Sequence, residues 1–537
     1  MEFVLALHSH LPYVLNHGRW PHGSDWLCEA AIDTYLPLLE HLRALKQEKT
    51  PAPVTIGFTP VLANQLASDD FRSEFDTFMN QRETACKEAP ASLAKTADSS
   101  LLPVVEYWKA RFSRLRRLYD EADRDLVGAF RELQESGRLE IIGSAATHGY
   151  LPLFARDESI QLQLAIGQAE HKRLFGTAPK GCWLPECAYR PGIETHLADA
   201  GFRFFFVDAH LAHAGTPLGV DYDIPLGAER FDSERHGTPH PVEAKIEHTP
   251  YRAYRVSRGR RAVSAFVRDP QSSRQVWSRD LGYPGDAAYL EFHKIRWPGG
   301  LKFWRVTGPN VDLGAKRAYD PGAALGRATE HARHFTELLT GISERAKRGE
   351  GLVTAPFDTE LFGHWWHEGV DFIADMYRAM KRQKGVKPVT ASQHLSAHPP
   401  REAIQLAEGS WGVNGDHTMW RNELTNWTWP RLGHLEESFW KVAPKAIRKS
   451  ELHPVLAQAA RELVLAQSSD WQFMISTGAV PDYAEKRFKQ HCDDAERLIS
   501  AMTEGPESGG QRLAADLQKR DHLFPNVLES VAKVLGS

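Results

Sequence analysis

The sequence contains few cysteines and no paired cysteine motif. Only five occur among 537 residues, and they include no CxxC pair. An odd, scattered set is typical of reduced thiols and argues against a disulfide-bonded secreted scaffold. The cysteines therefore predict a cytoplasmic protein.

Long apolar segments and targeting signals are also missing. Residues 1–8 form a short apolar run without a basic leader, which is typical of a strand and not of a signal peptide. No run approaches the roughly 20 apolar residues that a membrane-spanning helix needs. We therefore expect no membrane partner.

Neither sign of charge is in large excess. The chain has 65 basic and 69 acidic side chains, for a formal net charge of −4. Nucleic acids and anionic membranes both select for a basic excess, so we expect no nucleic-acid partner and favour a neutral ligand. Clustered Trp and His residues suit a sugar, because aromatic faces stack on sugar rings, although Trp also fills large cores.

Short apolar runs alternate with helical patterns along the first two thirds of the chain. The runs predict buried strands at Phe3–Leu7, Val54–Phe58, Leu139–Ser144, Cys182–Leu184, Phe202–Val207, Ala262–Val267 and Leu352–Phe357. The intervening patterns predict helices at Asp25–Lys46, Lys109–Glu135, Asp157–Phe175 and Ala323–Lys347. This alternation indicates an α/β fold with a parallel sheet or barrel.

The length exceeds that of a usual single domain. We expect a catalytic domain over residues 1–391, with inserted segments near 81–103 and 209–254. The first insertion has weak periodicity and is expected to be a loop or small subdomain. Strand signals stop at about Ser392, so residues 392–537 are predicted to form a helical domain that contributes to the ligand cleft.

Polar side chains follow six of the seven predicted strands. They are His8 and His10, His148, Glu186, Asp208, Arg268 and Asp269, and Asp358 and Glu360. The C-terminal ends of barrel strands converge on one mouth, where the chemistry of such folds is found. Exposed strand ends tolerate polar residues in any protein, but so many titratable groups favour an active site.

Glu186 follows the fourth predicted strand. Tyr189 and Arg190, close behind it, could hold its carboxylate ionised, as a nucleophile must be. The simpler alternative is a glutamate in the first turn of a helix.

Asp358 lies at the end of the seventh strand, near Trp365 and Trp366. Aromatic surroundings desolvate a carboxyl group and raise its pKa, which suits a general acid. Glu360 competes for this role. Glycoside cleavage needs one acid and one carboxylate on opposite sides of the bond, and this pair supplies both.

His8 and His10 point to the same side of an extended strand. With His148 and Asp208 they could bind zinc. They could equally bind sugar hydroxyls, position Glu186, or be hydrogen-bonded core histidines.

Further clusters rich in Trp, Gly and Asn lie in the predicted helical region. They cover Trp411–His417, Trp420–Trp427 and Ser469–Trp471. We interpret them as a sugar-stacking wall that faces the barrel mouth. Gly282–Asp286, after Trp277, is interpreted as another ligand-facing loop.

With these motifs the sequence resembles glycoside hydrolase family 57, and within it the 1,4-α-glucan branching enzymes. Five blocks match in order: His8–Tyr13, Gly57–Pro60, Trp183–Glu186, Phe357–Trp365 and Trp411–Trp420. The resemblance covers nearly the whole chain. It implies an incomplete (β/α)7 barrel followed by an all-helical C-terminal domain, with neither metal nor cofactor.

The resemblance also implies a retaining reaction on α-glucans such as amylose and glycogen. Glu186 would be the nucleophile and Asp358 the general acid/base, and the cleaved chain would pass to a 6-hydroxyl. Residues implied or expected to contact substrate are His8, His10, His148, Arg268, Trp277, Gly285, Trp411, Trp420 and Asp470. The oligomeric state is left open.

Three alternatives remain at this stage. The first is an α-amylase-like hydrolase or 4-α-glucanotransferase of the same family. The second is a metal-dependent polysaccharide deacetylase that uses the histidines with Asp208, and the third is a non-catalytic glycogen-binding protein. Branching members typically carry a loop tyrosine that excludes water, but residues 233–248 contain none. More hydrolysis is therefore expected here than in a typical branching enzyme.

Overall fold

The computed structural model describes residues 1–96, 98–219, 248–256, 262–278, 281–346, 350–383, 385–505 and 508–536. The segment 233–248, which lacks the expected tyrosine, lies outside the described residues except for His248.

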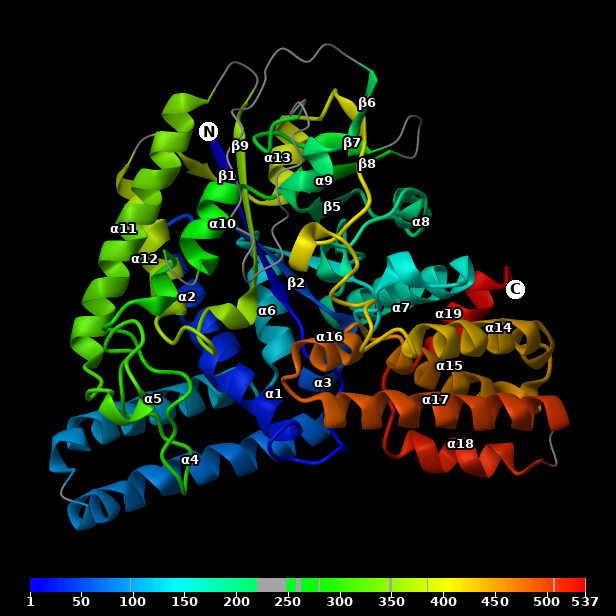
Figure 1. Cartoon of the computed structure of the whole chain (residues 1–537), viewed down its shortest axis with the longest axis horizontal. Helices are drawn as coiled ribbons and strands as arrows, with labels where there is room; N and C mark the ends of the chain where they lie inside the picture. The colour runs from blue at the N-terminus through cyan, green and yellow to red at the C-terminus, as the bar shows by residue number, and fades with distance from the viewer. Residues whose placement is uncertain are drawn as a thin grey trace.

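A seven-stranded parallel sheet forms the centre of the fold, in the spatial order β9-β1-β2-β3-β4-β5-β8. The strands are β1 (Glu2–Ser9), β2 (Val54–Phe58), β3 (Leu139–Ser144), β4 (Gly181–Trp183), β5 (Phe204–Val207), β8 (Val263–Val267) and β9 (Leu352–Asp358). Each contains one of the predicted apolar runs or most of it. In Figure 1, β1 and β9 lie side by side near the middle of the molecule.

The two ends of this sheet approach each other without forming a full ladder. Arg268, just after β8, forms one isolated parallel bridge with Thr354 of β9. The Asp269 amide also donates to the Thr354 carbonyl at 2.8 Å. The predicted incomplete (β/α)7 barrel is thus confirmed.

Four short strands extend the sheet. They are β6 (Thr216–Gly219), β7 (Tyr254–Val256), β10 (Lys387–Pro388) and β11 (Ala403–Gln405). β7 runs antiparallel to β8, and β11 lies between β7 and β6. β11 follows the point where strand signals were expected to stop, so that expectation was wrong for these three residues. Its pattern is too short to stand out from a loop. The domain boundary at 391/392 stays a prediction.

Helices connect the strands of the barrel sheet. They are α1 (Ser24–Ala30), α2 (Leu36–Gln47), α3 (Pro60–Leu66), α4 (Asp69–Lys95), α5 (Leu102–Glu121), α6 (Leu126–Glu135), α7 (Asp157–Phe175), α8 (Ile193–Asp199), α9 (Ala209–His213), α10 (Pro270–Trp277), α11 (Pro321–Arg345), α12 (Gly369–Arg382) and α13 (Ala391–Ala397). A π-helical turn, Ala31–Tyr35, joins α1 to α2. Helix α7 has the predicted bounds: acidic residues occupy its first turn, and Gly176 follows its last residue with a left-handed φ of 80°.

The segment 81–103, expected to be a loop or small subdomain, is mostly helical, so only the loop alternative was wrong. α4 continues through Lys95, and α5 begins at Leu102. The segment is rich in Ala, Glu and Lys, which favour helix, and its buried residues Ala85, Ala89 and Leu93 recur at helical spacing. α4 and α5 form the long pair at the lower left of Figure 1.

The predicted helix at Lys109–Glu135 is divided in two. Asp123 and Arg124 have positive φ angles of 51° and 59°, which end the helical path after α5. Asp125 then caps α6 by accepting a hydrogen bond from the Gly128 amide at 2.9 Å.

The C-terminal helices pack beside α7 (Figure 1). They are α14 (Thr428–Ala446), α15 (His453–Ala466), α16 (Asp470–Thr477), α17 (Pro481–Glu504), α18 (Gly510–Gln518) and α19 (Val527–Val534). α15 is the central helix of this group and contacts α14, α17, α18 and α19. One continuous hydrophobic core includes both barrel residues, such as Leu7, and helical-domain residues, such as Leu463.

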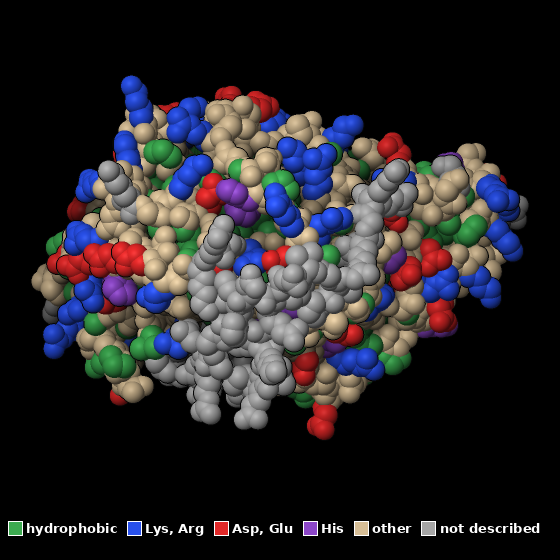
Figure 2. Space-filling model, turned by 90° about the horizontal axis from the view of Figure 1, so that it is seen from above, with side chains coloured by type: hydrophobic (Ala, Val, Ile, Leu, Met, Phe, Trp, Pro, Cys, Tyr) green, Lys and Arg blue, Asp and Glu red, His purple; other side chains and the backbone are tan. Residues whose placement is uncertain are grey.

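Acidic and basic side chains alternate over the face drawn in Figure 2, around the central atoms shown in grey. Within the described ranges, no helix combines the length and apolarity needed to cross a lipid bilayer.

Candidate active site

A cavity of about 700 Å³ lies at the C-terminal ends of the barrel strands and extends to the helical domain. Predicted site residues that line it are His8, His10, His148, Glu186, Arg268, Trp277, Asp358, Trp411, Trp420 and Asp470. Gly285 does not line it and lies exposed at the end of a 3-10 turn. Residues more than 400 positions apart are thus brought to one cavity.

Glu186 stands on a strained turn after β4. Its φ is +59° and that of Cys187 is +46°, which is the left-handed region that side chains other than glycine rarely adopt. Both oxygens of its carboxyl group accept hydrogen bonds. Trp411 Nε1 donates to Oε2 and Ser469 Oγ to Oε1, each at 3.0 Å.

The expected partners of Glu186 were wrong. The Tyr189 hydroxyl donates to Glu194 at 2.8 Å, and Arg190 Nε donates to the Pro152 carbonyl at 3.1 Å. Tyr189 stacks on Phe205 within a hydrophobic cluster, away from the cavity. Nearness in sequence suggested these partners, but the actual donors come from residues more than 200 positions later.

Burial dominates the ionisation of Glu186. It raises the pKa of this carboxyl group to about 7, and the charge of Asp470 acts in the same direction. The hydrogen bonds from Trp411 and Ser469, together with His10, lower the pKa and so oppose burial. Glu186 therefore ionises near neutral pH.

Asp358 ends β9, where it pairs in register with His8 of β1. Burial raises the pKa of Asp358 well above its usual value, and the charges of Glu360 and Glu186 raise it further, while Arg268 opposes them. This direction agrees with the desolvation expected from the sequence. Both carboxyl groups of the cavity thus have pKa values raised by burial, and the charge of Glu186 contributes to the rise at Asp358.

Glu360 is engaged more fully than Asp358. The Tyr35 hydroxyl donates to its carboxyl group, and the His10 amide donates to Oε1 at 3.1 Å. Burial raises the pKa of Glu360 to about 7, although the Tyr35 bond lowers it. Within the described residues, no side chain or amide donates to the Asp358 carboxyl group. Asp358 is therefore freer to exchange a proton with a ligand.

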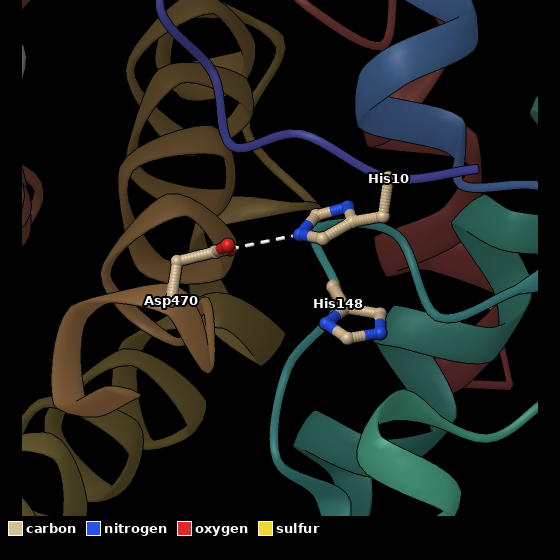
Figure 3. A group of neighbouring side chains, drawn as sticks. All are labelled: His10, His148 and Asp470. Carbon is tan, nitrogen blue, oxygen red and sulfur yellow. Dashed lines mark hydrogen bonds and ion pairs between the residues drawn. The ribbon is translucent and has the colours of Figure 1, made fainter. Parts of the chain in front are cut away.

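His10, His148 and Asp470 all line the cavity, and Figure 3 shows the His10 ring directed toward Asp470 with His148 next to it. His10 Nε2 bonds Asp470 at 2.9 Å, and His10 Nδ1 bonds the Thr59 hydroxyl at 3.0 Å. The ring of His148 stacks on that of His10, with centroids 4.1 Å apart. Burial acts to lower the pKa of His10, but the charge and hydrogen bond of Asp470 raise it on balance.

The zinc arrangement considered from the sequence is not formed, because Asp208 lies elsewhere. It pairs with Arg268 at 3.1 Å and caps α9. His10, His148 and Asp470 do bring possible ligand atoms within 4.8 Å of one another. However, both ring nitrogens of each histidine already have hydrogen-bond partners. The group is organised as a hydrogen-bond network.

Aromatic side chains form much of the cavity wall. Trp411 lies under the Arg268 guanidinium, with Cζ 5.7 Å from its ring centroid. Trp420 stacks on Tyr150 at 4.5 Å and is almost fully buried, so it offers a ligand little of its surface. Lining aromatics that were not predicted as ligand contacts are Trp26, Phe292, Trp365 and Phe473. Of these four, only Trp365 could have been identified from the sequence, because it belongs to the Phe357–Trp365 block that carries the family resemblance.

The family model "Glycosyl hydrolase family 57" matches residues 4–407, and "1,4-alpha-glucan branching enzyme, C-terminal" matches residues 432–531. A 1,4-α-glucan branching enzyme of Thermococcus kodakarensis is 38% identical over 98% of this chain and 77% of its own length. The crystal structure of a branching enzyme from Pyrococcus horikoshii has a TM-score of 0.87 at 35% identity, covering 99% of this chain and 96% of that one.

A structure named as the α-amylase AmyC of Thermotoga maritima is more distant. It has a TM-score of 0.83 at 28% identity and covers 99% of both chains. The family model spans three quarters of the chain, and a full-length relative exceeds 30% identity. The chain belongs to glycoside hydrolase family 57.

Proposed function

We propose that the protein is a retaining 1,4-α-glucan branching enzyme. The observation that carries the proposal is the shared cavity of Glu186 and Asp358, lined with aromatic rings and closed by the helical domain. The C-terminal model and the branching-enzyme relatives support the same activity and favour it over the deacetylase and binding-protein alternatives.

In the first step, Glu186 attacks the anomeric carbon while protonated Asp358 gives its proton to the leaving glycosidic oxygen. The glucan chain is then bound to Glu186 as an ester. In the second step, ionised Asp358 removes the proton of an acceptor 6-hydroxyl, whose oxygen displaces Glu186. Both carboxyl groups return to their starting states, and an α-1,6 branch replaces an α-1,4 bond.

The ligand contacts are part of this proposal. Trp277 and Trp411 would stack on glucosyl rings, and Arg268 and the Asp470–His10 pair would bind hydroxyls. Gly285 lies outside the cavity, and its proposed contact would require a glucan that extends beyond the cavity.

Amylose and glycogen are the proposed substrates, glycogen synthesis is the proposed process, and the cytoplasm is the proposed location. Five free, buried cysteines support this location.

The proposal is tested by incubating the protein with amylose and treating the product with a debranching enzyme. Branching predicts that short chains are released from the product only after debranching. If only reducing sugar accumulates, the protein is a hydrolase. If unbranched chains of new lengths appear, it is a 4-α-glucanotransferase. The Glu186→Gln variant controls for contaminating activity.

A further inference from the structure

A chain of hydrogen bonds links the barrel histidines to Glu186. His8 Nε2 lies 2.9 Å from His148 Nε2, and His148 Nδ1 lies 2.9 Å from Ser469 Oγ. Ser469 Oγ donates to Glu186 Oε1 at 3.0 Å. His148 Nδ1 itself lies 3.7 Å from Glu186 Oε1, too far for a hydrogen bond, so the serine hydroxyl joins two groups that do not bond directly.

The donor and the acceptor of each hydrogen bond in this series follow from the bond between Ser469 and Glu186. An ionised carboxylate can only accept, so the single hydroxyl proton of Ser469 goes to Glu186. The hydroxyl oxygen must then accept from His148 Nδ1–H, which leaves His148 Nε2 as an acceptor. His8 must therefore carry its proton on Nε2.

Two further observations agree with this assignment. Burial lowers the pKa of both His8 and His148 well below the usual value, and the charge of His10 lowers both further, so both rings are neutral. His8 Nδ1 is buried without a hydrogen-bond partner among the described residues, as suits an unprotonated nitrogen better than an N–H group. His8 also stacks on Trp183 at 4.5 Å with nearly parallel rings, which fixes its orientation.

We propose that Ser469 is a positioning residue that connects the fixed tautomers of His8 and His148 to Glu186 and holds that carboxylate in its reactive orientation. Ser469 is fully buried and immediately precedes α16, so the helical domain supplies this contact. Its amide also donates to the His148 carbonyl at 3.0 Å, which holds the hydroxyl in register with the ring. The inference rests on Glu186 as the nucleophile of the proposed function.

The hydroxyl also favours ionised Glu186 over its protonated form. Charged and titratable groups facing Glu186 are Asp470 and His10, Asp358 and His148. Asp470 favours the protonated form and His10 the ionised form, and neither changes when the Ser469 hydroxyl is removed. Loss of that donor therefore raises the pKa of Glu186.

The test is the pH dependence of kcat/KM for amylose consumption, whose acidic limb reports ionisation of the nucleophile in the free enzyme. For Ser469→Ala we expect this limb to move upward by about one pH unit, which is the size of one hydrogen bond to a charged group. Near pH 6, kcat/KM would then fall on the order of 10-fold below wild type. Ser469→Thr keeps a hydroxyl and should restore the limb.

Two comparisons separate positioning from general damage. Ser476→Ala removes the hydroxyl of another serine of α16, which accepts a hydrogen bond from Asn422 Nδ2 at 2.8 Å, and should leave the profile unchanged. His148→Asn keeps an N–H donor near the Nδ1 position and tolerates the φ of +58° at this residue, whereas His148→Phe lacks the donor. We expect the acidic limb to move more in His148→Phe than in His148→Asn.

An unmoved acidic limb in folded Ser469→Ala would overturn the positioning role, as would equal shifts in both His148 variants. Glu186→Gln is measured in the same assay. If that variant retains activity, the nucleophile assignment fails and the proposed function with it. If it is inactive while Ser469→Ala keeps the wild-type profile, only the positioning role fails.

Discussion

The two carboxyl groups of the proposed reaction differ in what surrounds them. Glu186 accepts two hydrogen bonds, which oppose the rise of its pKa to about 7, whereas Asp358 accepts none from the described residues and burial raises its pKa well above the usual value. Environments that separate the pKa values of two acids are how one site provides both a nucleophile and a proton donor. The assignment of roles therefore depends on environment and not on residue type.

Substituting each carboxyl group should separate its role. We expect Asp358→Asn and Glu186→Gln each to lower branching activity by about 10²- to 10⁴-fold or more, because each removes one reacting group. With an α-maltosyl fluoride donor, which needs no proton to leave, Asp358→Asn should still form the glycosyl-enzyme ester, and Glu186→Gln should not. Fluoride release measures this first step.

The control for this pair is Glu437→Gln, a change of an exposed glutamate on α14. It should leave both assays unchanged. If Glu186→Gln releases fluoride at the wild-type rate, Glu186 is not the nucleophile, and the roles assigned to the two carboxyl groups are wrong.

Among the elements, the π-helical turn Ala31–Tyr35 and the turn after β9 depend on each other. Tyr35 ends the π turn and donates to Glu360. Gly363 has a φ of +115°, and a Cβ there would lie 2.1 Å from the Asp33 carbonyl oxygen. Close backbone approach thus holds the Asp358–Glu360 turn in place, and it requires a residue without a side chain.

Replacing Gly363 with alanine should destabilise the protein and damage its site. The positive φ costs about 1–3 kcal/mol, and the clash with backbone adds to it. We expect a lower Tm and a lower kcat, measured by thermal unfolding and amylose consumption. Gly314→Ala is the matched control, since its Cβ would meet open space and the change should be silent. A Gly363→Ala variant with wild-type Tm would contradict this packing argument.

Glu436 of α14 connects the helical domain to the barrel. Its carboxyl group accepts from Gln467 Nε2 and from the Arg156 amide, each at 2.9 Å. Burial raises the pKa of Glu436 to about 7, while these hydrogen bonds lower it. A raised pKa means that the folded protein binds this proton more tightly than the unfolded chain, so this contribution to stability is lost as pH rises toward and through 7.

Glu436→Gln should remove that pH dependence. At pH 5 the variant and wild type should have similar Tm values, because wild-type Glu436 is then protonated. At pH 8 the variant should be more stable, by up to roughly 3 kcal/mol for a shift of this size. Thermal unfolding at both pH values measures the difference, with Glu437→Gln as the neighbouring exposed control. If the Tm of Glu436→Gln minus that of wild type is lower at pH 8 than at pH 5, the predicted direction of the pH effect is wrong.

The whole molecule is held by a core that crosses from the barrel to the helical domain. Trp440 of α14 belongs to this core, and its Nε1 donates to Ser159 of α7 at 2.9 Å. Gln163 of α7 likewise donates to Gln467 at 3.1 Å. Since the cavity also takes residues from both parts, we expect unfolding of either part to abolish activity.

Calorimetry should therefore show one cooperative transition that coincides with loss of activity. Trp440→Ala should lower its Tm without dividing it, because a buried Trp-to-Ala change costs about 3–5 kcal/mol and acts on both parts. Leu313→Ala, which truncates a side chain that is 50% exposed, should change little. Two separate transitions in wild type, with activity lost only in the second, would show that the parts unfold independently.

Local sequence pattern was sufficient for the seven central strands, for helices such as α7 and α11, and for the strand-end residues. Buried parallel strands are continuous apolar runs, and polar residues at their C-terminal ends must meet at one mouth. Two segments differ from what their local pattern predicted. The segment 81–103 became helix because its apolar residues find a partner in α5, and β11 became a strand because β7 and β6 lie beside it.

The surroundings of each site residue could not be predicted in the same way. Glu186 was matched with Tyr189 and Arg190 because they are near in sequence, yet its donors are Trp411 and Ser469. The pKa values of buried carboxyl groups depend on desolvation and on charges a few ångströms away, which come from distant segments. Residue type and strand position therefore determined which groups could react. Long-range packing decided how strongly burial and neighbouring charges raise the pKa of each group and which neighbours hold it.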